Sequence, residues 1–160
     1  RDSGLKRYGV FYPLQTMSRS SFPDFSQIPI CVDAYNFEDL ELLKGLAAKI
    51  SPKVHHISDE QRAVLHLAAV IVNNFTNHLF HIGHSILKDE QIPFELLIPL
   101  IKETAAKLDT GSPKEIQTGP AKRGDLSTIV RHLELLETYP EYHKIYRMLT
   151  ESIANEHRVT

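Results

Sequence analysis

Cysteine is almost missing from this 160-residue sequence, which contains only Cys31. A single cysteine cannot form a disulfide within the chain, and such sparing use is typical of proteins from reducing compartments. The first seven residues are mostly polar and lack the apolar core of a signal peptide. We therefore expect a cytoplasmic protein.

The sequence also lacks an excess of charge of one sign and has no long apolar run. The formal net charge is -2 at pH 7, which gives no bulk attraction to nucleic acid or to an anionic membrane. The longest apolar stretch, residues 63–72, is interrupted by His66 and falls short of the roughly 18 residues needed to span a bilayer. We predict neither a nucleic-acid partner nor a membrane partner.

What is present is the composition of an ordinary globular protein, with 42% hydrophobic and 24% charged residues. Strand patterns cover residues 8–12, 28–32 and 53–57, and Asn36 can cap a helix over residues 37–50. Because this helix links the second and third strands, those two should be parallel. One helix cannot cover both faces of a mostly parallel sheet, so we expect that an upstream part of the sheet is missing.

Only helices are expected from Ser58 onward. Ser58 and Gln61 form a capping pattern, Pro99 is expected to kink a helix, and Asp125 and Pro140 can each begin one. The expected helices cover residues 58–87, 93–108, 125–137 and 140–155, with a loop over 109–122. The fold class is therefore predicted to be mainly α, with a small α/β part over residues 1–57 and a helical part over 58–160.

Polar residues on the first of these helices need an explanation. Residues 63–72 are apolar on every side except at His66, a pattern typical of a buried helix. At about 100° per residue, five polar residues fall within about 40° of one line. They are Arg62, His66, Asn73, Asn77 and His84, with His81 near the edge and Asn74 about 80° from His66.

Three readings of this polar stripe remain open. The stripe faces water or bonds to neighbouring backbone, or it forms the wall of a cleft that holds a small substrate or a cofactor ring. A metal site is the weakest of the three, because His78, His81 and His84 fan out over about 120° and no cysteine pair or zinc motif supports them. We predict no metal.

The segment Thr118–Asp125 is the most motif-like part of the chain. Its glycines and proline fix a turn, and Asp125 can cap the following helix, which by itself explains the pattern. Alternatively, Arg123 and the loop amides bind an anionic group such as a carboxylate or a phosphate. His132 shares a helix face with Asp125 and is either a titrating group or a core histidine. The Arg-Gly-Asp tripeptide is not taken as an integrin ligand, since nothing in the sequence indicates secretion.

Three segments together resemble a bacterial family in which a Rossmann-like domain precedes a helical domain of unknown function. They are Tyr12-Pro13-Leu14-Gln15, residues 62–74 (RAVLHLAAVIVNN) and residues 117–133 (QTGPAKRGDLSTIVRHL). Members of this family are often labelled NADP oxidoreductases. The resemblance covers nearly the whole chain, and its last segment is the most specific.

This resemblance implies an architecture and a cofactor. Residues 1–57 would be the C-terminal tail of a Rossmann-like sheet, and residues 58–160 the dimerising, substrate-side domain similar to the C-terminal domain of 6-phosphogluconate dehydrogenase. NADP or NAD is expected in the full-length protein, bound by an upstream glycine-rich turn. None of the seven glycines here has that arrangement, so we expect no dinucleotide on this fragment and no activity from it alone.

The same resemblance implies roles for named residues. His66 and Asn74 are the expected catalytic residues, and Tyr12 and Pro13 are expected to contact the cofactor. The expected substrate-binding residues are Arg123, Asp125, Gln15, Asn73 and His132. The sequence departs from the family pattern at Tyr12, where a histidine is usual, at Leu65, where a tyrosine is usual, and at Val70, where related hydroxyacid dehydrogenases place a lysine before the asparagine.

Two functional hypotheses follow. In the first, the chain is the C-terminal domain of an NAD(P)-dependent oxidoreductase that acts on a small carbonyl, imine or hydroxyacid, and it forms a homodimer. In the second, it is a non-catalytic dimerisation or ligand-sensing module, as the missing lysine and missing glycine loop would allow.

Overall fold

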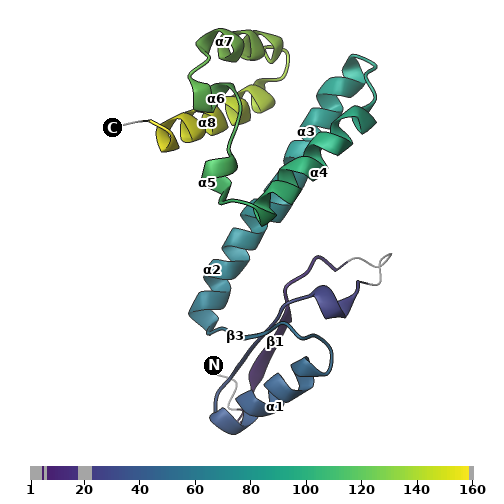
Figure 1. Cartoon of the computed structure of the whole chain (residues 1–160), viewed down its shortest axis with the longest axis vertical. Helices are drawn as coiled ribbons and strands as arrows, with labels where there is room; N and C mark the ends of the chain where they lie inside the picture. Colours follow the sequence, from purple (N-terminus) through teal and green to yellow (C-terminus); the bar gives the residue numbers. More distant parts are fainter. Residues whose placement is uncertain (1–4, 6, 18–22, 159–160) are drawn as a thin grey trace. The chain divides into compact units, whose positions relative to one another are not determined.

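The computed structural model describes residues 5, 7–17 and 23–158. By packing, the chain divides into two compact units, residues 1–76 and 77–160. This border falls within a long helix, and the predicted domain boundary after residue 57 stays a prediction. The fold is mainly helical, with a three-stranded sheet at the N-terminal end (Figure 1).

The sheet of the first unit has the order β1-β2-β3. It consists of β1 (Gly9–Pro13), β2 (Ile30–Ala34) and β3 (Val54–His56). As expected for strands linked by a helix, β2 and β3 are parallel. By contrast, β1 runs antiparallel to β2, so the sheet is mixed rather than mostly parallel. A short 3₁₀ turn, η1 (Phe25–Gln27), precedes β2.

Helix α1 (Phe37–Ala48) covers one face of this sheet, and the Asn36 side chain caps it by accepting from the Asp39 amide. Buried side chains of Ile30, Val32 and Ala47 form the core between them. The lack of a side chain at Gly9 leaves room for Leu43 of α1, because a Cβ at Gly9 would be 2.6 Å from Leu43 Cδ1. The core of this unit is therefore a single layer between the sheet and α1.

A continuous helix of 31 residues, Asp59–Asp89, follows the sheet. It is made of α2 (Asp59–Ala69), a π-helical segment η2 (Val70–Phe75) and α3 (Thr76–Asp89). The predicted capping box is confirmed, since Ser58 Oγ accepts from the Gln61 amide and the Gln61 side chain accepts from the Ser58 amide. By length and composition alone, this helix could cross a membrane, a test that core helices of soluble proteins also pass.

The expected burial of residues 63–72 is wrong for the chain by itself. Val64, Leu67 and Val72 leave 60–70% of their surface exposed, and Ile71 and Phe75 about half or more. An apolar pattern along a helix does not distinguish burial within one chain from a surface that another molecule covers.

The second unit contains helices only among its described residues. After α3 come η3 (Phe94–Leu97), α4 (Ile98–Ala106), η4 (Lys107–Asp109), α5 (Pro113–Ile116), α6 (Pro120–Arg123), α7 (Leu126–Leu135) and α8 (Pro140–Glu156), and α6, α7 and α8 pack together (Figure 1). The predicted starts of α7 and α8 are confirmed. Pro99 lies in the first turn of α4 and produces no kink inside a helix, and the expected loop over 109–122 contains two short helices.

Candidate functional site

Two residues of the polar stripe, His66 on α2 and Asn73 on η2, face the end of strand β1. His66 Nδ1 lies 3.4 Å from the Tyr12 hydroxyl, and the Asn73 side-chain amide donates to the Thr16 hydroxyl at 2.9 Å. Tyr12 lies on β1 and Thr16 follows it, so both contacts join the helix to the strand and the turn after it. The structure therefore brings together three residues expected at a site, Tyr12, His66 and Asn73.

The turn after β1 is held by backbone bonds. The Leu14 amide donates to the Pro29 carbonyl at 2.9 Å, and the Gln15 amide to the Pro13 carbonyl at 3.0 Å. The exposed Gln15 side chain accepts from the amide of Thr16 at 2.8 Å. Pro13 and Gln15 thus stand at the same strand end as Tyr12. The side chain of Asn74 is exposed and makes no hydrogen bond to the described residues.

Arg62 belongs to the same stripe, one turn before His66. Its Nη2 forms an ion pair with Asp59 at 2.7 Å, and this hydrogen bond, together with the charges of Asp59 and Asp33, raises the pKa of the Arg62 guanidinium. Its Nε is buried with no hydrogen-bond partner among the described residues. Within the first unit, the stripe residues Arg62, His66 and Asn73 therefore all lie on the side of the helix that faces the sheet.

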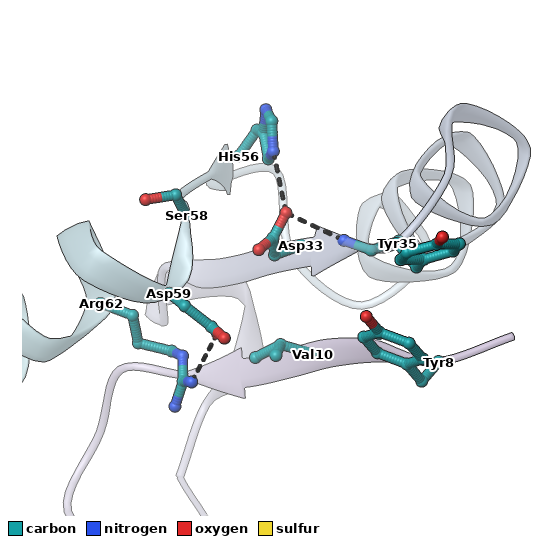
Figure 2. Close-up of a pocket in the computed structure, with 10 residues that line it drawn as sticks. Tyr8, Val10, Asp33, Tyr35, His56, Ser58, Asp59 and Arg62 are labelled. Atoms are coloured by element: carbon teal, nitrogen blue, oxygen red, sulfur yellow. Dashed lines mark hydrogen bonds and ion pairs between the residues drawn. The ribbon is translucent and has the colours of Figure 1, made fainter. Parts of the chain in front are cut away.

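Sequence reasoning missed a pocket at the opposite end of the strands. It has a volume of about 580 Å³ and lies where β2 and β3 end and β1 begins. Figure 2 shows Asp33 directed into the space between β2 and the start of α2, with His56 above it and Arg62 on the helix side. Asp33 Oδ1 lies 3.2 Å from His56 Nε2 and accepts from the Ala34 amide at 3.0 Å.

One signal in the sequence could have indicated this pocket. Asp33 directly follows the apolar strand pattern of residues 28–32, and polar residues that follow parallel strands gather at one sheet edge. Cys31, two residues earlier, is buried, and burial raises the pKa of its thiol. The cysteine therefore contributes to the core rather than to a reactive site.

The other predicted site residues lie in the second unit. Asp125 caps α7: its carboxylate accepts from the Thr128 amide at 3.1 Å, from the Thr128 hydroxyl at 2.7 Å and from Ser127, and these bonds lower its pKa. His132 Nδ1 lies 2.8 Å from the Tyr146 hydroxyl in a half-buried pair. The Arg123 side chain is exposed and makes no hydrogen bond or ion pair to the described residues, while its backbone amide donates to the Gly119 carbonyl at 3.3 Å.

These observations define a mainly helical protein that begins with a small α/β sheet and has a polar site where one helix meets the end of a strand. The chain belongs to the DUF2520 family, a domain of unknown function, whose model matches residues 28–153. No protein with curated annotation matches the chain significantly.

The chain is similar to two solved structures. One is the "putative NADP oxidoreductase BF3122" from Bacteroides fragilis, with 42% identity and a TM-score of 0.91 over 96% of this chain and 60% of that one. The other is protein TM1727 from Thermotoga maritima, with 24% identity and a TM-score of 0.76 over 93% of this chain and 61% of that one, which shows the fold alone. The chain therefore spans about three fifths of each relative, and the first relative supports an oxidoreductase-like family.

Proposed function

We propose that this chain is the C-terminal part of an NAD(P)-dependent oxidoreductase that acts on a small carbonyl, imine or hydroxyacid. The observation that carries this proposal is the meeting of His66 and Asn73 with the end of β1, because it places an imidazole able to act as acid or base beside an amide and a phenol at one polar position. The name of the Bacteroides fragilis relative supports NADP as the cofactor.

His66 is the proposed acid or base at the reacting oxygen or nitrogen. The nicotinamide, when bound, supplies or accepts the hydride. As a general acid, His66 acts in its protonated form: Nδ1–H donates to the Tyr12 hydroxyl oxygen, and Nε2–H gives its proton to a developing alkoxide or amine, which leaves a neutral imidazole. Histidine suits this role because its side chain changes charge near neutral pH.

The other site residues have binding roles in this proposal. Asn73 and Asn74 lie in the π-helical segment η2, a rare distortion that is frequent at functional sites. Asn74, which is free to rotate toward a ligand, orients the substrate, while Asn73 and Gln15 line the same strand end. Tyr12 and Pro13 contact the cofactor. In the second unit, the exposed guanidinium of Arg123 binds an anionic group, with Asp125 and His132 fixing its surroundings.

The experiment is a titration of NADPH into the full-length protein, followed by the nicotinamide fluorescence. Saturable binding, together with oxidation of NADPH by at least one small carbonyl or imine from a panel, is the expected result. Absence of binding at millimolar nucleotide would contradict the proposal and favour the non-catalytic reading.

We also propose that the chain forms a homodimer through the outer side of α2 and η2. Five apolar side chains are exposed there, namely Val64, Leu67, Ile71, Val72 and Phe75. In the described part of the second unit, only Ile82, Ala121 and Leu136 are buried apolar residues, so its helices lack an enclosed core of their own. A second copy offers the same apolar surface, as a two-fold interface requires. Sedimentation as a monomer at high concentration would contradict this dimer.

A further inference from the structure

The pocket at the far end of the strands is a second place where a ligand can bind. Since β1 is antiparallel to β2 and β3, the residues at the start of β1 and the ends of β2 and β3 share one edge. Tyr12 and Pro13 lie toward the other edge. At about 580 Å³ the pocket falls within the usual range for small-molecule sites, which is roughly 300–1,000 Å³.

One wall of this pocket offers an unused hydrogen-bond acceptor. Both printed contacts of the Asp33 carboxylate, to the Ala34 amide and to His56, involve Oδ1. Its Oδ2 makes no hydrogen bond within the described part of the chain, although the side chain is only 19% exposed. An N–H or O–H donor on a ligand can bond to this oxygen in place of water.

The other wall is aromatic. The rings of Tyr8 and Tyr35 lie with their centroids 5.2 Å apart and their planes tilted by 35°, and both rings border the pocket in Figure 2. Tyr35 is 67% exposed, so a face of the pair is available to a further planar ring. Stacking of a base on an aromatic side chain tolerates many ring types.

The charge of the pocket disfavours phosphate. Two carboxylates, Asp33 and Asp59, and one guanidinium, Arg62, line it, so the pocket is negative on balance when His56 is neutral. A ligand that fits both walls has a planar ring and amino or hydroxyl donors. We propose that this pocket binds a nucleoside or nucleobase without its phosphate groups, at a site separate from that proposed for the dinucleotide.

Adenosine is the probe, titrated by calorimetry into the full-length protein with and without saturating NADP. We expect saturable binding that NADP does not displace and that adenosine monophosphate does not improve. Tyr35→Ala should weaken binding about tenfold through lost stacking. Asp33→Asn should weaken it by about fivefold or more, because the acceptor charge is lost. Phe37→Ala removes an equally exposed aromatic ring outside the pocket and should leave binding unchanged.

Three results would overturn the proposal. They are no binding of adenosine or guanosine at millimolar concentration, binding that neither Tyr35→Ala nor Asp33→Asn weakens, and displacement of adenosine by NADP. None of these measurements depends on turnover, so failure here is distinguishable from failure of the proposed oxidoreductase. Circular dichroism of each variant confirms that a loss of binding is not a loss of fold.

Discussion

The side-chain amide of Asn73 donates to the Thr16 hydroxyl at 2.9 Å and thereby links the π-helical segment to the turn after β1, 57 residues earlier in the chain. This bond fixes the distance between the helix that carries His66 and the strand end that carries Tyr12. It is exposed, so its net free energy is small and its effect is positional.

We therefore predict that, in the proposed reaction of the full-length protein, Asn73→Ala raises KM several-fold and changes kcat less. Thr16→Val should have the same effect, and the double variant should be no worse than either single variant, because all three lack the same bond. Steady-state kinetics of the four proteins checks this prediction. Additive losses would show that the two residues act separately.

The outer side of α2 and η2 allows a test of the homodimer. Leu67→Glu and Val72→Glu place a charge in the proposed interface, where desolvation without a partner is costly. We expect each variant to sediment as a monomer at concentrations where the natural protein is a dimer. Leu42→Glu introduces the same charge at an exposed leucine of α1 and should leave the dimer intact.

Gly9 gives a prediction on stability. A methyl group there would meet Leu43 Cδ1 at 2.6 Å and the Asp33 carbonyl oxygen at 2.7 Å. Gly9→Ala should therefore destabilise the protein by about 1–3 kcal/mol through overpacking. Gly45→Ala is the matched control, since nothing lies within 4 Å and alanine favours the helix by up to about 1 kcal/mol. Urea unfolding measures both, and a neutral Gly9→Ala would contradict the packing described.

The contact between Arg7 and Asp39 predicts a dependence of stability on pH. Arg7 Nε donates to Asp39 Oδ1 at 2.8 Å, and this hydrogen bond, with that from Asn36, holds the pKa of the Asp39 carboxyl below its usual range. Because the folded pKa is the lower one, this stabilisation is complete above the unfolded pKa of about 3.9 and is lost as pH falls through the folded value. Asp39→Asn should remove this part of the pH dependence, as urea midpoints between pH 5 and pH 2 would show. An equal fall of the urea midpoint with pH in the two proteins would contradict this prediction.

The sequence was sufficient for the strands, the capped helices and the polar stripe, because each depends on local spacing. Arg62, His66 and Asn73 share the side of the helix toward the sheet, as the angular spacing predicts. The direction of β1 could not be predicted, because the sequence between β1 and β2 is long enough for either direction. The pocket of Asp33 and His56 was missed because it joins residues 23 positions apart on neighbouring strands.

The exposure of residues 63–72 shows a second limit of prediction from sequence. Their composition predicted burial, yet the side chains of Val64, Leu67 and Val72 are exposed in the single chain. Hydrophobic periodicity reports that a surface is apolar, whereas the identity of the covering molecule depends on assembly. The expected kink at Pro99 was wrong for a local reason. A proline fits the first turn of a helix, where Pro99 lies, and breaks a helix only in its interior.

The most direct test of the catalytic account compares single-turnover oxidation of bound NADPH in the natural full-length protein and in His66→Ala, with a substrate found by the panel. We predict that His66→Ala binds NADPH with unchanged affinity and transfers hydride about 10²- to 10⁴-fold more slowly, as expected when a general acid is removed. Equal transfer rates in the two proteins would contradict the role assigned to His66 and to its contact with Tyr12.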